Sequence, residues 1–159
     1  MKNIFLFAIT LFLFSCNSSA QDKKEVKKYK ITKSDAQWKA DLSEIQYNVL
    51  RKAGTERPFT SPLNKIYEEG TYVCAACNTD LFEGKNKFDS GTGWPSFDQE
   101  IEGNVAFDVD HKLGYARVEE HCGTCGGHLG HVFNDGPATT GKRHCVNGAA
   151  LKFIPKKKD

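Results

Sequence analysis

Two pairs of cysteines constrain the fold of this chain more than any other feature of its sequence. The stretch "CAAC" carries Cys74 and Cys77, and "CGTC" carries Cys122 and Cys125. A spacing of two residues lets both sulfurs of a pair converge on one ion, and two pairs complete a tetrahedral shell of four thiolates. Such a closed shell stabilises the fold and leaves no open position for catalysis, so the pairs predict one structural Zn²⁺ per chain.

Two other interpretations of the cysteine pairs stay open at this level. Two disulfides would suit an exported protein, because disulfides persist in oxidising compartments. A thioredoxin-type redox motif would need a CxxC at the start of a helix in a βαβ pattern, and neither pair has that setting. The stretch between the pairs is longer than in common zinc fingers, which indicates an insert rich in hairpins.

The N-terminal sequence has the features of an export signal. Lys2 precedes an apolar run at residues 4–14, which is too short to span a bilayer but has the length of a signal-peptide core. The run ends in "LFSC", which resembles the bacterial lipobox and implies cleavage before Cys16 and lipidation of that cysteine. An ordinary cleaved signal with an incidental cysteine is the alternative. We therefore expect an exported protein, anchored by lipid to a bacterial membrane, with its domain facing the periplasm.

Length and composition fit one folded domain behind this segment. Hydrophobic residues make up 39% of the 159 residues, which is enough for one core, and the net charge of +2 is too small to indicate nucleic-acid binding. We expect a signal peptide at residues 1–15, a flexible polar tether at 16–33, the domain at 34–155 and a basic tail at 156–159.

The domain begins with helical signals and continues with strands. The stretch "SEIQ" at residues 43–46 has capping-box spacing, and Gly54 suits the end of the helix that follows. The apolar stripe of that helix is Ile45, Val49 and Ala53. Beyond residue 66, short alternating stretches such as "NVAFDVD" at 104–110 predict half-buried antiparallel strands. The expected fold is mainly β, with short N-terminal helices.

One further cysteine in the domain lacks a nearby partner. Cys145 lies in "KRHCVNGA", with Arg143 two residues before it and Asn147 two residues after it. Residues two apart share a face on a strand, so the guanidinium would favour the thiolate and lower its pKa. A small buried hydrophobic side chain is the alternative. The neighbours favour a reactive thiol, because an ordinary cysteine is only a few per cent thiolate at neutral pH.

Two more motifs supply polar and aromatic groups. The stretch "HLGHVF" contains His128 and His131. A lone histidine is usually structural, but two histidines that accompany a reactive thiol suit proton transfer. The stretch "SGTGWPSF" places Trp94 among turn-forming residues, where an indole either fills the core or forms the wall of an apolar pocket. The sequence leaves both interpretations of Trp94 open.

Taken together, these motifs resemble the B-type methionine sulfoxide reductases, which reduce the R epimer of methionine sulfoxide. The matching stretches are "LRKAGTERPFTSPL", "GTYVCAACNTDLF", "FDSGTGWPSF", "HCGTCGGHLGHVFNDGP" and "GKRHCVNGAALKF". They follow the family order from about residue 34 to residue 155. The resemblance implies two antiparallel sheets with short N-terminal helices, a structural zinc site and the activity of a peptide-methionine (R)-S-oxide reductase.

The resemblance also implies roles for individual residues. Cys145 is the expected nucleophile, and Trp94 is expected to pack on the S-methyl group of the substrate. The groups expected to line the oxygen site or to support the thiolate are His128, His131, Asn147 and Arg143. The expected zinc ligands are Cys74, Cys77, Cys122 and Cys125.

The sequence departs from the family pattern at one position. Many members carry a resolving cysteine within the "SGxGWPSF" stretch, where this chain has Thr92. With Cys16 lipidated and four cysteines on zinc, no internal thiol would remain to react with an oxidised Cys145. We therefore expect an external small thiol or a thioredoxin-like protein as the reductant. The alternative from another class is a zinc-ribbon interaction module without catalysis.

Overall fold

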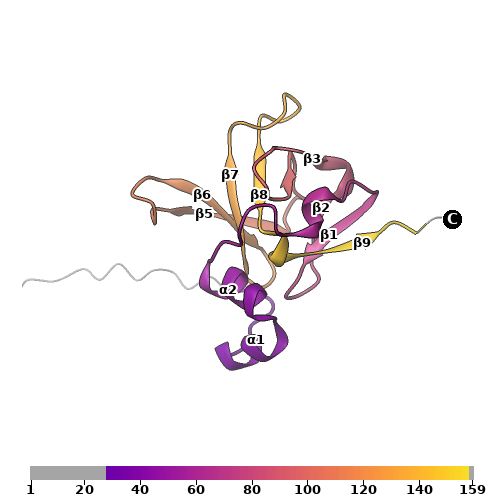
Figure 1. Ribbon diagram of the computed structural model, residues 1–159. Helices are drawn as coiled ribbons and strands as arrows, with labels where there is room; N and C mark the ends of the chain where they lie inside the picture. Colours follow the sequence, from indigo (N-terminus) through magenta and orange to yellow (C-terminus); the bar gives the residue numbers. More distant parts are fainter. Residues whose placement is uncertain (1–27, 158–159) are drawn as a thin grey trace, which may run out of the picture.

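The computed structural model describes residues 28–157 of the chain. Two short helices precede two antiparallel sheets (Figure 1), so the expected mainly β fold is confirmed. The predicted signal peptide, Cys16 and most of the predicted tether lie outside the described residues. Within the described part, no helix has the length and apolar character needed to cross a bilayer.

The elements follow one another in a simple order. The helical segments are α1 (Asp35–Asp41), α2 (Glu44–Lys52), and the 3-10 turns η1 (Pro62–Lys65), η2 (Gly84–Asn86) and η3 (Gly148–Ala150). The smaller sheet has the order β2-β1-β9 and consists of β1 (Gly70–Cys74), β2 (Asp80–Glu83) and β9 (Leu151–Pro155). The larger sheet has the order β3-β4-β8-β7-β6-β5 and consists of β3 (Lys87–Phe88), β4 (Ser96–Phe97), β5 (Val105–Asp110), β6 (Arg117–Cys122), β7 (His128–Phe133) and β8 (Arg143–Val146).

Both α-helices begin with a capping box. At Ser34–Gln37 and at Ser43–Gln46, the serine side chain accepts from the backbone N–H of the glutamine, and the glutamine side chain accepts from the backbone N–H of the serine. The prediction from "SEIQ" is therefore confirmed. The residue that ends α2 in the left-handed conformation is Ala53, with φ 49°, and not the expected Gly54.

Only part of the expected apolar stripe of α2 is buried. Val49 is fully buried, whereas Ile45 is 46% exposed. The second buried contact comes from Leu50, which packs so closely on Gly127 that a Cβ there would lie 2.8 Å from Leu50 Cδ2. Helix α2 thus rests on the start of β7 with its second half, and its first turn stays open to solvent.

Ordered contacts begin before the predicted domain boundary at Ser34. The backbone N–H of Ile31 donates to the carbonyl of Thr124 over 3.0 Å. The Tyr29 ring lies edge-on to the His121 ring, with centroids 6.0 Å apart. The last residues of the predicted flexible tether therefore lie against the second cysteine hairpin and form part of the domain.

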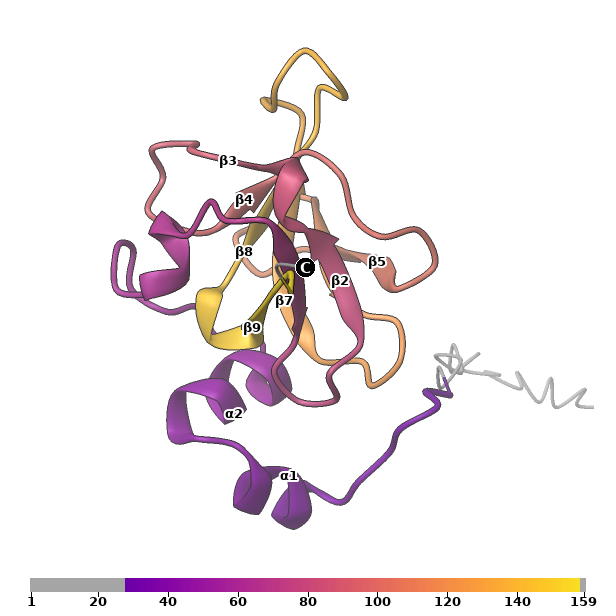
Figure 2. The ribbon, with the colours of Figure 1, turned by 90° about the vertical axis from the view of Figure 1, so that its right-hand side faces the viewer.

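Aromatic rings join the two sheets. Phe82 of β2 stacks on Phe97 of β4 with centroids 4.4 Å apart, and Tyr72 of β1 meets the same ring at 4.9 Å. All three side chains are fully buried. Figure 2 shows the smaller sheet in front of β7 and β8. This aromatic core therefore supports β8, the strand that carries Cys145.

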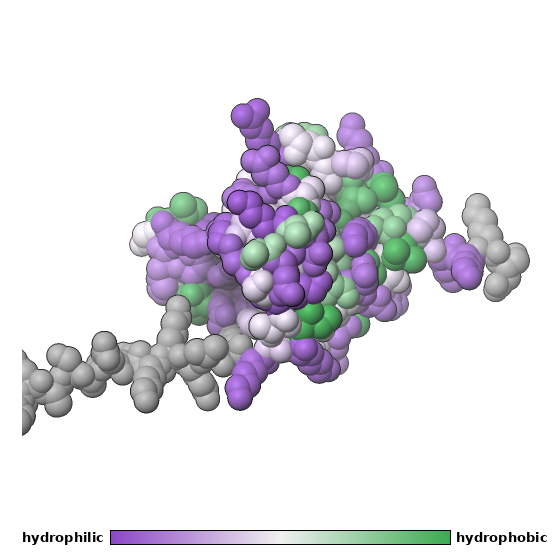
Figure 3. Space-filling model, turned by 90° about the horizontal axis from the view of Figure 1, so that it is seen from below, coloured by the Kyte–Doolittle hydropathy of each residue, from purple (hydrophilic) through white to green (hydrophobic). Residues whose placement is uncertain are grey.

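The β5–β6 hairpin extends beyond the core. Of the three apolar residues expected to be half-buried there, Val105 is buried, but Phe107 and Val109 are 41% and 63% exposed. The hairpin projects from the body in Figure 1, and Figure 3 shows hydrophobic and hydrophilic side chains mixed on the lower face of the molecule. The alternation therefore predicts the strand correctly but not which of its residues are covered.

Candidate active site and zinc centre

The four paired cysteines lie together at one point between the two sheets. Their ligand atoms all lie within 4.8 Å of one another. The sulfurs of Cys74 and Cys125 are 3.8 Å apart, and those of Cys77 and Cys122 are 3.5 Å apart. Tetrahedral zinc with Zn–S bonds of about 2.3 Å places its sulfurs about 3.8 Å apart, so the cluster fits a structural zinc ion.

The structure also distinguishes zinc from the two other interpretations of these cysteines. A disulfide needs sulfurs about 2.05 Å apart, and all four thiols are free. Each pair sits at the turn of a β-hairpin, β1–β2 or β6–β7, and not at the start of a helix. The residue after each second cysteine is left-handed, with φ 58° at Asn78 and 68° at Gly126. The two turns are thus equivalent halves of one Cys₄ site that ties the sheets together.

Cys145 lies in the middle of the larger sheet and opens onto a small pocket. Across the strands it pairs with Ser96 of β4 and His131 of β7. The pocket has a volume of about 150 Å³ and is lined by Thr55, Trp94, Arg117, Gly130, His131, Phe133, Cys145 and Asn147. The structure therefore brings four of the predicted residues, from three separate motifs, to one cavity.

Burial has the largest effect on the pKa of the Cys145 thiol. It raises the pKa of Cys145, while the positive charge of Arg143 and a hydrogen bond from Thr92 lower it, and the net shift is upward. Arg143 is itself held by two bonds to Asp135, of 2.8 and 2.9 Å, and lies over the Phe133 ring at 4.3 Å. The expected effect of the guanidinium is present, but the expectation of a lowered pKa is wrong, because desolvation outweighs a charge that is already paired.

Both histidines of "HLGHVF" are paired with carboxylates. His131 Nε2 lies 2.7 Å from Asp110 Oδ2, and the same oxygen accepts from Arg117. His128 Nδ1 lies 2.6 Å from Glu119 Oε1. The two imidazole rings have centroids 5.5 Å apart, but only His131 lines the pocket.

Three of these partners were missed at the level of sequence: Asp110, Arg117 and Glu119. Asp110 and Arg117 are directly opposite each other in the β5–β6 register, and Arg117 and Glu119 are two residues apart on β6. The alternation of charged residues in "DHKLGYARVEE" is the signal that could have placed them on one face. Hydrogen bonds, first from the backbone of Lys112 and then from His131, keep the pKa of Asp110 well below its ordinary value, so its carboxylate stays charged.

Asn147 and Trp94 are both anchored to one residue of the loop after α2. Asn147 Oδ1 accepts from the backbone N–H of Glu56 over 2.9 Å, and its Nδ2 donates to the carbonyl of Leu129 over 2.8 Å. Trp94 Nε1 donates to the carbonyl of Glu56 over 3.2 Å. Trp94 is therefore a wall of the pocket, held by its polar edge, and not a plug of the core.

The side of β8 that faces away from Cys145 carries a buried ionic group. His144 lies between Glu120, 2.7 Å from its Nδ1, and Glu100, 3.1 Å from its Nε2. Burial lowers the pKa of His144, but the hydrogen bond with Glu120 and the carboxylates of Glu120, Glu100 and Asp98 raise it overall. Burial also raises the pKa of Glu120. The pairing with Glu120 therefore favours the protonated form of His144.

Thr92 lies beside Cys145 in a short chain of hydroxyls. Its Oγ1 is 2.8 Å from Ser90 Oγ, which is 2.7 Å from Ser96 Oγ. Ser96 is the cross-strand neighbour of Cys145. In the described residues, the other four cysteines all belong to the zinc cluster. The position at which many members of the resembling family are expected to carry a resolving cysteine is therefore close to Cys145 and carries a hydroxyl here.

Comparison with known proteins agrees with this geometry. The family model of the SelR domain matches residues 42–155. A peptide methionine sulfoxide reductase MsrB from Leptospira interrogans is 52% identical over 126 residues, which cover 79% of this chain and 96% of that protein. The MsrB of Bradyrhizobium diazoefficiens is 53% identical, covering 80% of this chain and 92% of the relative, and that of Methylibium petroleiphilum is 45% identical, covering 88% and 99%. With its Cys₄ centre, its lone Cys145 and this similarity over most of its length, the chain belongs to the SelR family of B-type methionine sulfoxide reductases.

Proposed function

We propose that the chain reduces the R epimer of methionine sulfoxide, free or in oxidised proteins, to methionine. The observation that carries this proposal is the 150 Å³ pocket, in which Cys145 meets an indole wall, an imidazole and a carboxamide. A thiol, a proton source and an apolar surface are the groups that reduction of a methyl sulfoxide requires. The membership of the SelR family supports the same activity.

The reaction transfers the sulfoxide oxygen to Cys145. The thiolate attacks the substrate sulfur once the oxygen is protonated or strongly hydrogen-bonded, the sulfur–oxygen bond breaks, and methionine leaves. Cys145 keeps the oxygen as a sulfenic acid, so the substrate sulfur is reduced and the cysteine sulfur is oxidised by two electrons. The raised pKa of Cys145 means that the attacking thiolate is the minor form of this side chain in the free protein.

We assign to His131 the role of proton donor to the sulfoxide oxygen. It lines the pocket and faces Cys145 across the β7–β8 ladder, and Asp110 orients its ring through Nε2. His128 is nearly buried and lies behind His131, and burial lowers its pKa, so its role is to position its neighbour through the ring contact. The bond to Asp110 holds the His131 ring in one orientation, from which the imidazole can hydrogen-bond or protonate the departing oxygen.

The selection of one epimer follows from three fixed directions. The methyl group packs on Trp94, the oxygen points to His131 and the carboxamide of Asn147, and the sulfur faces Cys145. The opposite epimer exchanges two substituents on sulfur, so it cannot satisfy all three contacts in one pose. Arg143 supports the thiolate from beyond the pocket wall, since its charge acts on Cys145 while its guanidinium stays bound to Asp135.

An external thiol regenerates the enzyme. The sulfenic acid and two thiols yield the Cys145 thiol, a disulfide of the donor and water. A thioredoxin-like protein or a small thiol fits this step, because the remaining described cysteines form the zinc cluster. One equivalent of sulfoxide should leave a dimedone-reactive Cys145 that persists until a thiol is added. A Cys145 disulfide within the wild-type chain after one turnover would contradict an external donor.

Export and lipid anchoring are a separate part of the proposal. The apolar run at residues 4–14 and the "LFSC" stretch support a lipoprotein whose domain faces the periplasm. The experiment compares the full chain with Cys16→Ala after fractionation of the expressing bacteria. Wild-type protein should remain with the membrane and Cys16→Ala should not. The same distribution for both would contradict anchoring at Cys16.

Turnover of methionine-R-sulfoxide with dithiothreitol as reductant tests the main proposal. A zinc-ribbon interaction module would bind zinc, fold and leave the sulfoxide unchanged. The enzyme should convert the R epimer and leave the S epimer unreacted. Absence of turnover by folded, zinc-loaded protein would favour the interaction module.

A further inference from the structure

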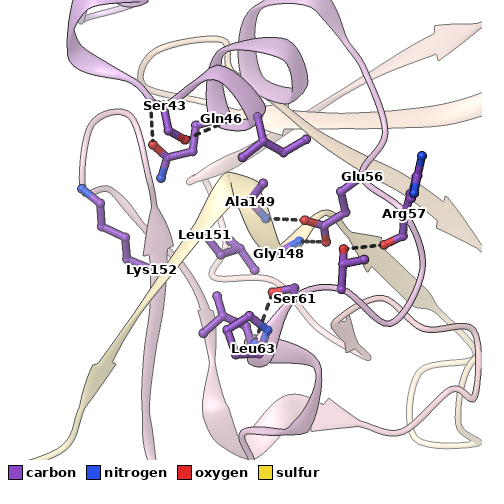
Figure 4. A pocket seen from close by; sticks show the side chains of 13 residues that line it. Ser43, Gln46, Glu56, Arg57, Ser61, Leu63, Gly148, Ala149, Leu151 and Lys152 are labelled. Atoms are coloured by element: carbon purple, nitrogen blue, oxygen red, sulfur yellow. Dashed lines mark hydrogen bonds between the residues drawn. The ribbon is translucent and has the colours of Figure 1, made fainter.

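Glu56 carries a buried carboxylate that the chemistry above does not use. It lies in the loop between α2 and η1 and is 7% exposed. No basic side chain pairs with it among the described residues. Instead, its two oxygens accept from the backbone N–H groups of Gly148 over 2.5 Å and Ala149 over 2.9 Å, as Figure 4 shows. A buried carboxylate is costly unless it is hydrogen-bonded, so these two bonds decide where the loop lies.

Those two N–H groups are the first of η3, and capping them is ordinarily the task of the residue before the helix. That residue is Asn147, whose side chain makes no capping bond. The Glu56 carboxylate satisfies the donors in its place. The Asn147 amide is thereby left to contact other groups, and it lines the pocket beside Cys145.

The orientation of that amide is also set by Glu56. Asn147 Oδ1 faces a donor, the backbone N–H of Glu56, and Nδ2 faces an acceptor, the carbonyl of Leu129. A flipped amide would meet the wrong partner on both sides, so the amide has one stable orientation. A carboxamide nitrogen carries two hydrogens, and the bond to Leu129 uses one of them. The second hydrogen is left for an oxygen acceptor.

The carbonyl of the same residue holds the indole. Trp94 Nε1 donates to it over 3.2 Å. The main chain of Glu56 thus joins two walls of the pocket that lie 38 and 91 residues away in the sequence. The close approach also needs glycine at 148, since a Cβ there would lie 2.0 Å from Ser61 Oγ and 3.2 Å from Glu56 Oε1.

We propose that Glu56 is a positioning residue of the active site. The Glu56 carboxylate accepts hydrogen bonds from the start of η3, so that the Glu56 main chain fixes the Asn147 amide and the Trp94 indole. Its effect on turnover rests on the proposed function, whereas its effect on the two side chains does not. Burial raises the pKa of Glu56, and the two backbone hydrogen bonds lower it. Glutamine cannot replace it, because an amide has one acceptor oxygen and would set an NH₂ group against a backbone N–H.

The test compares Glu56→Gln with a matched control, Glu69→Gln, which removes an exposed carboxylate that pairs with exposed Lys156. Side-chain NMR resonances of Asn147 and of the Trp94 indole report the geometry, and the Trp38 indole serves as an internal reference. In Glu56→Gln, we expect the Asn147 and Trp94 signals to move and the Trp38 signal to stay.

The kinetic part of the test separates positioning from loss of the nucleophile. In Glu56→Gln, kcat/KM should fall about 10- to 100-fold, as for other displaced active-site groups. Alkylation of Cys145 by iodoacetamide should stay within about twofold of wild type, because Glu56 makes no contact with Cys145. The control should match wild type in every measurement.

A second variant keeps the test decisive if Glu56→Gln does not fold. Ala149→Pro removes one N–H from the other end of the same contact, at a helix start that tolerates proline. It should move the same two resonances. Resonances at their wild-type positions in either folded variant, or kcat/KM within about twofold of wild type despite shifted resonances, would overturn the proposal. If wild-type protein lacks sulfoxide turnover, the resonances still decide whether Glu56 positions the two side chains.

Discussion

Loss of one zinc ligand should destabilise the whole domain and not merely one turn. The ion joins Cys77 to Cys122 and Cys74 to Cys125, pairs that are 45 and 51 residues apart. Closing a loop of about 50 residues with one cross-link removes unfolded-chain entropy worth about 4 kcal/mol. Single domains are stable by only about 5 to 15 kcal/mol. We therefore expect Cys122→Ser to lower the melting temperature by roughly 10 to 20 °C, and to lose zinc.

Cys145→Ser is the matched control for this substitution. It makes the same chemical change at the cysteine outside the Cys₄ cluster and keeps all four ligands. Metal analysis should find about one zinc per chain in wild type and in the control, and almost none in Cys122→Ser. Thermal unfolding followed by circular dichroism should show the large shift only in Cys122→Ser.

Two results would refute the cross-link as the source of stability. The first is Cys122→Ser that lacks zinc yet melts within about 2 °C of the control. The second is wild-type protein without zinc that retains its native melting temperature. Thiol titration in denaturant with a chelator then identifies the replacement, because zinc leaves all five described cysteines as thiols and two disulfides would leave only Cys145.

Four further predictions concern the reaction and its pH dependence. Cys145→Ser should remove sulfoxide turnover by at least about 10³-fold while the fold persists, and near-wild-type turnover would contradict its role as nucleophile. Trp94→Ala should raise KM about tenfold or more through loss of the methyl contact, with Cys145 alkylation unchanged; an unaltered KM would place the methyl group elsewhere. Thr92→Cys should convert the Cys145 sulfenic acid into a disulfide that mass spectrometry detects after one turnover, and a persistent sulfenic acid would mean that the loop does not reach. The pKa of His144 is raised above its ordinary 6.5 in the folded protein. The stabilisation that protonated His144 provides is therefore fully present below pH 6.5 and is lost as the pH rises through the pKa of the folded state. The urea concentration at the midpoint of unfolding should therefore decrease as the pH rises from about 6 to about 9 in wild type, and should decrease less in Glu120→Gln measured side by side. Equal decreases in both proteins would contradict the pairing.

Local features of the structure were predictable because they depend on residues close together in the chain. The capping box at Ser43 and the alternating strand at residues 104–110 follow from neighbours within a few positions. The joining of four cysteines was predictable from chemistry, since thiolates at this spacing form a closed tetrahedral shell. The sequence therefore determined the fold class and the zinc ligands, and it singled out Cys145 as the expected nucleophile.

Tertiary structure decided the surroundings of those residues. The raised pKa of Cys145 depends on how deeply packing buries its sulfur, which no spacing of Arg143 reveals. Asp110 meets His131 only through the register of three strands, and Glu56 meets Asn147 across 91 residues of sequence. Burial and long-range hydrogen bonds are properties of the packed chain as a whole, because each requires several segments to exclude water from the same place.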